Sequence, residues 1–202
     1  MISNLNEDPA DSGTTPLDAD EQAQLIPSFA TRSELNAFER MNILDANAWA
    51  LGPRVLKRSD PFIESYIRQL HKRMFDQTWK WAGKYRTTNK NLGVPFHRIL
   101  NDLAVVLGNT HYWMEHRTFD LDEIAIRYHH GLVSIHPFPN GNGRHARLLA
   151  DVVVMKYGRE RFSWGSKQFV DVAAARAEYI RCLKAADANN EDIQGLLRFA
   201  RS

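Results

Sequence analysis

His136-Pro-Phe-Pro-Asn-Gly-Asn-Gly-Arg-His-Ala-Arg147 is the stretch that decides how this 202-residue chain is interpreted. Its Gly141-Asn142-Gly143 run lies directly before a helical pattern. Glycine lets the backbone adopt positive φ and approach a ligand closely. Successive backbone amides at a helix N-terminus form a concave nest for phosphate oxygens. The stretch therefore predicts a phosphate-binding loop that leads into a helix.

The same stretch supplies a base and two cations. His136 precedes a Pro-Phe-Pro turn that ends helical structure, and a neutral imidazole there would accept a proton from an incoming hydroxyl. Arg144 and Arg147 are three positions apart, so both project from one helix face, and their forked donors match phosphate geometry. We expect Phe138 to anchor the loop in the core. Each feature alone is ordinary, but together at this spacing they indicate a nucleotide site.

Helical patterns surround this stretch. Asp60-Pro61 predicts a helix start, with a capping side chain followed by proline at the first helical position. The pattern at 144–157 is apolar nearly all round after its first turn, which suits a buried central helix. Apolar residues at helical spacing predict further helices from about residue 31 onward. The ranges are about 60–74, 103–114, 121–132, 144–157, 168–187 and 191–200.

One segment breaks the helical pattern. Residues 84–98 are rich in threonine, asparagine, glycine and proline, which are poor helix formers, and a short β-hairpin fits them better. The expected fold class is therefore all-α with one β excursion.

The N-terminal region differs from the rest in charge. Residues 1–24 are polar and acidic, and we expect a mobile arm there, followed by one domain over 25–202. Six acidic residues and no lysine or arginine precede Arg32, so the remainder of the chain is basic although the net charge is only +2. A basic body suits an anionic ligand, and a solvated surface with surplus charge accounts for it equally well.

Several function classes are disfavoured. No apolar run is long enough to cross a membrane, and no signal-peptide pattern is present. The lone Cys182 predicts a buried thiol and excludes an internal disulfide. No basic run with interleaved aromatic residues indicates direct nucleic-acid binding. A cytoplasmic protein is expected.

The stretch from His136 to Arg147 resembles the signature of the Fic (Fido) domain family, HPFx[D/E]GNGRxxR, at every position but one. Trp81-Ala-Gly-Lys-Tyr-Arg-Thr87 is similar to the approach to the Fic flap hairpin. Glu178-Tyr-Ile-Arg-Cys-Leu-Lys-Ala-Ala-Asp187 is similar to a helix near the end of that domain. The resemblance covers about residues 31–200, and chain length and Asn140 resemble the group called mobile mystery protein B. It implies an all-α Fic domain with a hairpin flap.

The resemblance implies transfer of AMP from ATP, with Mg²⁺, to a Ser, Thr or Tyr hydroxyl of a target protein. His136 would be the catalytic base. Asn142 and the amides around Gly141 and Gly143 would hold the α-phosphate. Arg144 would steady the α- and β-phosphates, and Arg147 the γ-phosphate.

Further roles follow from the same resemblance. The Thr88–Val94 segment, with Thr88, Asn89 and Gly93, would be the flap that pairs its backbone with an extended segment of the target. Tyr179 would border the pocket for the nucleotide base.

Asn140 is where this chain departs from the family, which has Asp or Glu as the Mg²⁺ ligand. An amide oxygen binds a hard cation but brings no negative charge. Two outcomes are open. Mg²⁺ arrives with the nucleotide and Asn140 is a weak neutral ligand, or the chemistry changes or is lost.

Many Fic proteins carry an inhibitory glutamate that pairs with the second arginine of the motif. The family form [S/T]xxxE[G/N] loosely resembles Ala30-Thr-Arg-Ser-Glu-Leu-Asn36, which makes Glu34 the candidate inhibitory residue. Thr31-x-x-Glu34 also fits an ordinary capping box at a helix start. Both interpretations are kept.

Three functions are therefore considered: an adenylyltransferase, a regulatory or toxin–antitoxin-type component that binds nucleotide without transferring it, and an enzyme that removes AMP from a modified protein. The mobile mystery protein B resemblance implies a helix-turn-helix companion protein as a partner.

Overall fold

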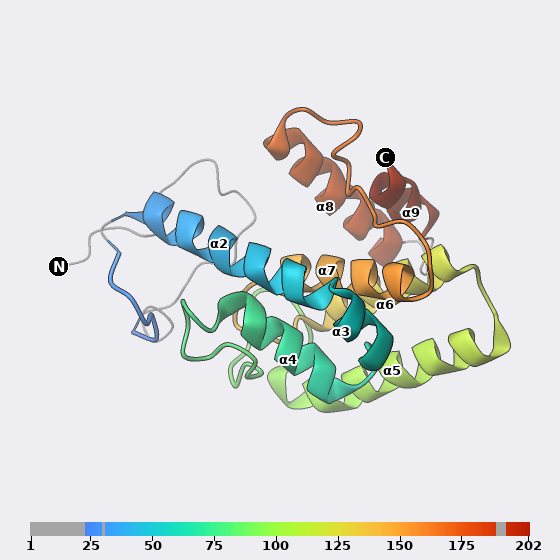
Figure 1. The fold of residues 1–202 in the computed structure, drawn as a ribbon. Coiled ribbons are helices and arrows are strands. Elements are labelled where there is room, and N and C mark those ends of the chain that lie inside the picture. Colours follow the sequence, from blue (N-terminus) through green and yellow to red (C-terminus); the bar gives the residue numbers. More distant parts are fainter. Residues whose placement is uncertain (1–22, 30, 189–192) are drawn as a thin grey trace.

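The structure is a computed structural model that describes residues 23–29, 31–188 and 193–202. Helices account for all the regular structure in these ranges, so the expected all-α class is confirmed (Figure 1). The order is α2 (Arg32–Ala50), α3 (Pro53–Arg58), α4 (Glu64–Phe75), a 3-10 turn η2 (Phe96–Arg98), α5 (Ile99–His116), α6 (Leu121–Ile135), α7 (Asn142–Lys156), α8 (Val172–Ala188) and α9 (Gln194–Arg201).

The central helix is α7. It packs against α6, α4 and α3, while α2 lies along α4 and α8 packs on α9 (Figure 1). Leu149, Val152 and Val153 of α7 are completely buried, as the apolar pattern over 144–157 predicts. Because the loop at 136–141 leads directly into α7, it is attached to the most buried element of the fold.

Two helix starts differ from the sequence prediction. The helix expected at Asp60-Pro61 begins at Glu64, because the Asp60 carboxylate accepts the Phe62 N–H at 2.9 Å and closes a separate turn first. The helix expected from 168 begins at Val172, where Asp171 accepts the N–H groups of the next turn. In both cases an aspartate fixes the turn, and the helix begins after it.

The expected β-hairpin over 84–98 is wrong, because these residues form no strand. A hairpin needs the carbonyls of its two arms to face each other's N–H groups. Here the carbonyls of Thr88 and Val94 accept instead from the Arg86 guanidinium. Asn89 Oδ1 accepts the Phe96 N–H at 3.0 Å and closes the segment on itself. We call residues 84–98 the flap.

The expected acidic arm falls almost wholly on residues 1–22, which lie outside the described ranges. Just after it, Gln24 to Ile26 run beside residues 78–80. The Ile26 N–H donates to the Thr78 carbonyl at 2.9 Å, and the Lys80 N–H donates to the Gln24 carbonyl at 3.0 Å. In the part of the chain that the structure describes, no helix is long and apolar enough to span a membrane.

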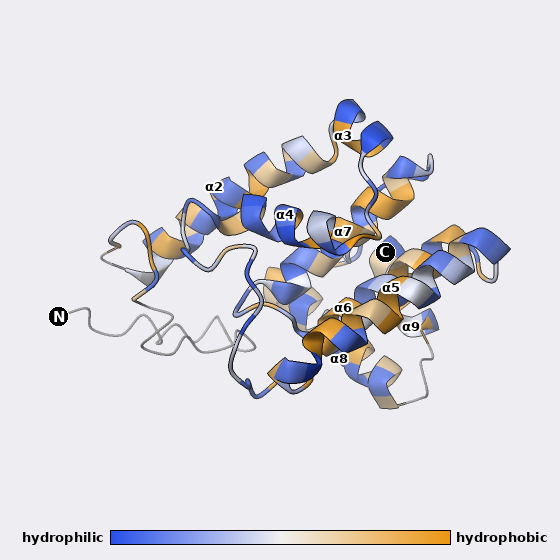
Figure 2. Ribbon diagram, turned by 90° about the horizontal axis from the view of Figure 1, so that it is seen from below, coloured by the Kyte–Doolittle hydropathy of each residue, from blue (hydrophilic) through white to orange (hydrophobic). Residues whose placement is uncertain are grey.

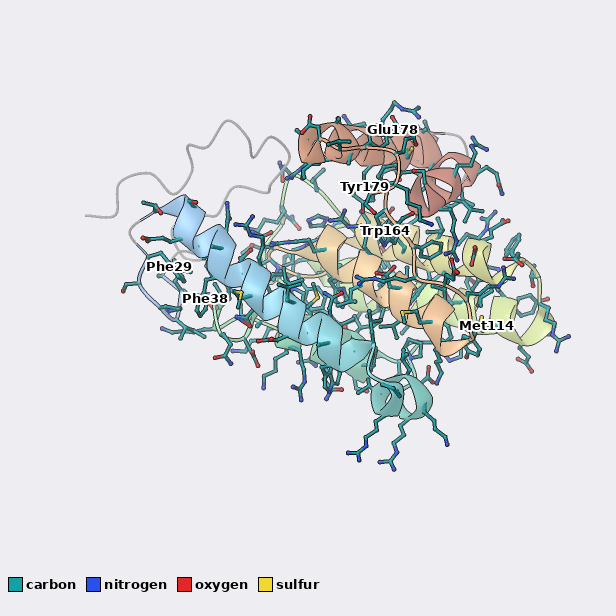
Figure 3. The ribbon with its side chains drawn as sticks, turned by 45° about the horizontal axis from the view of Figure 1, so that its top comes forward. Phe29, Phe38, Met114, Trp164, Glu178 and Tyr179 are labelled. Atoms are coloured by element: carbon teal, nitrogen blue, oxygen red, sulfur yellow. The ribbon has the colours of Figure 1, made fainter. Side chains whose placement is uncertain are left out.

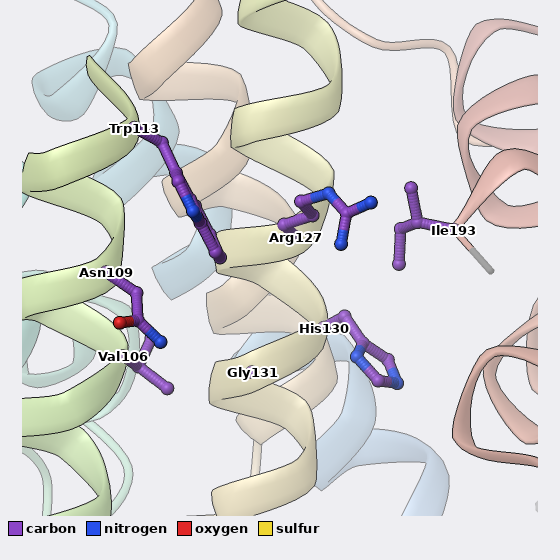
Figure 4. Close-up of a pocket in the computed structure, with 7 residues that line it drawn as sticks. All are labelled: Val106, Asn109, Trp113, Arg127, His130, Gly131 and Ile193. Carbon is purple, nitrogen blue, oxygen red and sulfur yellow. The ribbon is translucent and has the colours of Figure 1, made fainter. Parts of the chain in front are cut away.

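A small pocket lies between α5 and α6 (Figure 4). Trp113 of α5, Arg127 and His130 of α6, and Ile193 line it. The Arg127 guanidinium is 2.8 Å from the Glu123 carboxylate and lies over the Phe119 ring. None of the residues of the loop at 136–141 lines this pocket, so the pocket is separate from the candidate site.

Candidate active site

The loop between α6 and α7 is fixed by its own hydrogen bonds. Asn142 donates from Nδ2 to the Phe138 carbonyl and accepts the Phe138 N–H at Oδ1, each at 2.9 Å. Phe138 is completely buried and stacks on the His71 ring with centroids 3.6 Å apart, so the expected anchor is confirmed. With its side chain committed to Phe138, Asn142 has only its backbone N–H to offer a phosphate.

His71 holds the middle of the loop, and no sequence pattern indicated it. Its Nδ1 accepts the Gly83 N–H at 3.0 Å, which leaves Nε2 to donate to the Asn140 carbonyl at 3.1 Å. Complete burial holds the pKa of His71 well below its ordinary value, so the ring is neutral. One imidazole therefore ties the loop to the residues that enter the flap.

Gly141 is the turn into α7. Its φ is +77°, and a β-carbon there would lie 2.4 Å from the Phe75 ring. A side chain is excluded by conformation and by space. The Gly141 N–H is taken by Asn140 Oδ1 at 2.6 Å, so the nest predicted for phosphate begins with the amides that follow.

His136 caps α6 in a left-handed conformation, with φ 54° and ψ 59°. Such a conformation is uncommon for a residue with a side chain and concentrates at functional sites. The ring is half-buried, and Nδ1 lies 3.4 Å from the Val133 carbonyl. Donation from Nδ1 leaves the Nε2 lone pair available. Burial lowers the pKa of His136, so the imidazole is a neutral base at neutral pH.

The flap lies directly against His136. A β-carbon at Gly93 would be 2.4 Å from the His136 β-carbon, and Gly93 has a φ of +88°. The Val94 N–H donates to the Ile135 carbonyl at 3.2 Å, and the Arg86 N–H donates to the Pro137 carbonyl at 2.9 Å. The flap is thus joined to the backbone on both sides of the base.

Arg86 completes this junction and was missed in the sequence analysis. Its side chain is 4% exposed, and Nε donates to the His136 carbonyl at 2.7 Å. The same guanidinium donates to the carbonyls of Thr88, Val94 and Ile135. No local sequence pattern indicates it, because the Ile135 and His136 carbonyls that accept from its guanidinium lie 49 and 50 positions away along the chain.

The two motif arginines have different partners. Arg144 lies 2.6 Å from the Glu39 carboxylate and over the Phe75 ring. Arg147 lies over the Tyr179 ring, 5.0 Å from its centroid, and no carboxylate of the described residues forms an ion pair with it. Both arginines lie in the first turns of α7, but Arg144 contacts α2 and α4 whereas Arg147 contacts α8, so their expected convergence on one ligand stays a prediction.

Glu39 is the acidic residue that reaches the motif, and it was not a candidate in the sequence analysis. It is 5% exposed, and Trp79 Nε1 donates to its other oxygen at 2.7 Å. Glu34 lies at the start of α2, exposed, in a capping box with Thr31. The two glutamates are five positions apart, which places them on different faces of α2.

Tyr179 lies at the other side of the motif, on the face of α8 that is directed at α7 (Figure 3). Its hydroxyl is 2.9 Å from His129 Nε2 and 3.5 Å from where a β-carbon of Gly143 would be. Burial raises the pKa of Tyr179 to about 12. The structure thus places Tyr179 beside the nest. Its expected contact with the nucleotide base stays a prediction.

A model of the Fic/DOC family matches residues 61–154, which contain the flap and the loop. Residues 61–154 therefore form a domain of the Fic/DOC family. It is 29% identical over 149 residues to a protein adenylyltransferase Fic of Nematostella vectensis, covering 72% of this chain and 33% of the relative. The Drosophila melanogaster protein of that name is 31% identical over 137 residues, which are 66% of this chain and 26% of the relative. The chain thus spans about a third or less of these curated relatives.

Solved structures agree with the Fic fold. A fragment of Fic-1 from C. elegans is 25% identical, with a TM-score of 0.64, and the alignment covers 90% of this chain and 51% of the fragment. The BepC protein of Bartonella tribocorum, solved with bound AMPPNP, has a TM-score of 0.68 at 16% identity and covers 94% of this chain and 92% of its own. The second likeness shows the fold alone.

The residues of this Fic domain do not fit a protein-held Mg²⁺. Asn140 is 9% exposed and neutral, and its Oδ1 already accepts the Gly141 N–H. Among the described residues, no three His, Cys, Asp or Glu side chains gather at metal-binding distances. A hard cation prefers several oxygen ligands, usually with carboxylates among them. Any Mg²⁺ at this site would depend mainly on the phosphates that carry it.

Proposed function

We propose that this protein is an adenylyltransferase that transfers AMP from Mg-ATP to a hydroxyl of a target protein. One observation carries the proposal: a neutral, half-buried imidazole lies at the entrance of an amide nest, and two arginines follow the nest on α7. The names of the curated relatives support it, since both are called protein adenylyltransferases.

The chemistry assigns a role to each group. His136 Nε2 accepts the proton of the target hydroxyl, whose oxygen attacks the α-phosphorus. The bond from that phosphorus to the bridging oxygen of the β-phosphate breaks, and pyrophosphate leaves. The backbone N–H groups of Asn142 and Gly143 stabilise the charge on the α-phosphate oxygens. Arg144 balances charge on the α- and β-phosphates, and Arg147 on the γ-phosphate.

The flap would hold the target beside the base. Thr88, Asn89 and Gly93 are exposed, and Gly93 lies next to His136. An extended segment of the target that adds alongside the flap would therefore present its side chain to the imidazole. Because backbone groups would do the pairing, the flap would accept more than one target sequence.

Glu39 would restrain this activity. Its carboxylate forms an ion pair with Arg144 at 2.6 Å, in the position that a phosphate oxygen would take. ATP would have to exchange its phosphates for that carboxylate. We therefore assign the inhibitory role considered for Glu34 to Glu39, which reaches the first arginine of the motif and not the second.

Labelled ATP tests the proposed transfer. Incubation with α-³²P-ATP should label protein, whereas γ-³²P-ATP should not, because the β- and γ-phosphates leave together. His136→Ala should remove the label with the fold intact, since a general base contributes roughly 10²- to 10⁴-fold. Label from γ-³²P-ATP, or equal labelling of the His136→Ala protein, would contradict the assignment.

The position of Asn140 favours a second candidate. Without a charged metal ligand, the same pocket could bind nucleotide as a regulatory module and transfer nothing. Calorimetry that detects ATP binding, together with no protein label under any divalent ion, would support the module. Loss of label from a premodified protein would instead identify the reverse reaction, the removal of AMP.

A further inference from the structure

The outward face of α2 carries an apolar stripe. Ala37, Met41, Leu44 and Ala48 follow one another at helical spacing, and all four are exposed. Met41 is 61% exposed and Leu44 is 63% exposed. Figure 2 shows hydrophobic bands alternating with hydrophilic ones along α2. Phe38 beside the stripe is partly covered by the Phe29 ring, 5.4 Å away (Figure 3).

The stripe is not needed to hold α2 on its own molecule. Leu35, Glu39, Asn42, Ala46 and Ala50 form the opposite, buried face, and that face packs on α4. The helix therefore has two faces able to pack, and the described residues use only the one directed at α4. A contiguous row of exposed apolar side chains, here with Met41 and Leu44 at its centre, often marks an interface.

The charged residues beside the stripe indicate which partner would bind it. In heptad numbering, Ala37 and Leu44 occupy d positions, and Met41 and Ala48 occupy a positions. Arg40 is then at g and Asp45 is at e, and both are exposed. In a parallel helix pair, a g residue faces the e residue five positions later on the other helix. Each Arg40 would therefore meet the Asp45 of a second copy, twice in the pair.

We propose that two copies of this chain associate through α2, with the helices parallel and the stripe at the centre. The charge pattern requires the parallel orientation, because an antiparallel pair places g beside g and e beside e and leaves both charges unmatched. Glu39 is at f, directed away from the partner, so its contact with Arg144 is unaffected. The association does not depend on the proposed transfer reaction.

The contact is small. Two heptads of one helix bury less area than a standard stable interface of about 1,200–2,000 Å². We therefore expect a weak dimer whose population depends on concentration. Sedimentation velocity of the full chain, over roughly 1 µM to 1 mM, covers the range of such a complex. A monomer throughout that range overturns the proposal.

Charge reversal makes the test specific. Arg40→Glu places acid opposite acid twice, and Asp45→Arg places base opposite base twice, so each variant alone should dimerise at least tenfold more weakly. The double variant Arg40→Glu/Asp45→Arg should regain the wild-type dimer. A mixture of the two single variants should form a heterodimer, although neither pairs with itself. If both single variants dimerise as strongly as the wild type, the parallel pairing is contradicted.

Two further variants separate the stripe and the orientation from the charges. Leu44→Asp lies on the outward face, so it should abolish the dimer while leaving the circular dichroism spectrum and the melting temperature nearly unchanged. With a mild chemical oxidant such as oxidised glutathione added, Ala37→Cys should form a disulfide-linked dimer, because d faces d in a parallel pair. The wild-type chain is the control, since its Cys182 is buried. A folded Ala37→Cys protein that dimerises but never cross-links would refute the parallel arrangement.

Discussion

The two walls of the candidate active site are held in different ways. One wall is the flap with the loop at 135–141, where backbone N–H groups, carbonyls and the buried Arg86 make the connections. The other wall consists of Arg144 and Arg147, whose guanidiniums contact ring faces and one carboxylate. The first wall carries His136, the candidate base, and the second is expected to carry the phosphates.

The difference separates a fixed part of the site from an exchangeable part. Moving His136 requires breaking buried hydrogen bonds, each of which leaves a backbone group unsatisfied. Freeing Arg144 requires only the exchange of one anion for another of similar geometry. The base is therefore preorganised, whereas access to the arginines can be regulated.

Among changes that leave His136 in place, the largest effect is expected from Arg86→Ala, which removes the link within the fixed wall. The carbonyls of His136, Thr88 and Val94 lose their donor, so the free energy of unfolding should fall by about 3 kcal/mol. The melting temperature should then fall by roughly 6–12 °C. Transfer should fall by about 10²-fold even below the melting transition, because small displacements of a catalytic group are costly. Thermal melts and α-³²P labelling measure both.

Arg86→Lys is the matched control for charge. Lysine keeps the charge but cannot donate to several carbonyls through a planar fork, so it should recover little of either loss. Full recovery by lysine would show that charge, and not the hydrogen-bond geometry, is what the flap requires.

Glu39→Gln should act on the exchangeable wall in the opposite direction. The amide can still accept from Trp79 Nε1, but the charge that holds Arg144 is gone. Labelling with α-³²P-ATP should rise by about tenfold, which corresponds to about 1.4 kcal/mol. Isothermal calorimetry should show tighter ATP binding by a similar factor.

Glu34→Gln is the matched control on the same helix. Glutamine keeps the capping-box acceptor and removes only the negative charge near the helix N-terminus, so a loss of stability of about 0.3–1 kcal/mol is expected without a change in labelling. If labelling rises for Glu34→Gln and not for Glu39→Gln, the inhibitory role belongs to Glu34 after all.

Asn140→Asp tests whether the residue at position 140 of the fixed wall contributes to Mg²⁺ binding. A carboxylate adds the negative charge that a hard cation prefers, so the Mg²⁺ concentration for half-maximal labelling should fall by roughly three- to tenfold. Asn101→Asp, on the exposed face of α5, changes the net charge equally and should have no effect. An unchanged Mg²⁺ dependence for Asn140→Asp would show that position 140 does not contact the ion.

The sequence predicts the loop better than its surroundings, for a physical reason. The roles of Gly141 and Phe138 follow from local rules about backbone freedom and apolar burial. The contacts of Glu39 and Arg86 depend on segments 105 and 50 positions away along the chain, and no local pattern specifies them. The β-hairpin prediction failed because composition excludes a helix at 84–98 but does not distinguish paired strands from a loop held by a side chain.

The smallest expected effect is a shift in pH dependence. Burial lowers the pKa of His136, so the neutral base persists below pH 6.5, and the acid limb of the labelling rate should lie below that value. His71, His129 and His145 are also buried with lowered pKa values, that of His145 to about 4. The unfolded chain therefore binds more protons than the folded chain below pH 6.5, and stability should fall as the solution is acidified.

Melting temperatures recorded at each pH of the rate profile separate these two effects. If the rate falls at a higher pH than the melting temperature does, the limb reports the ionisation of a group in the site. If the two fall together, the limb reports unfolding driven by the buried imidazoles. A rate limb above pH 6.5 in folded protein would mean that the fixed wall does not keep His136 neutral, and preorganisation of the base would have to be abandoned.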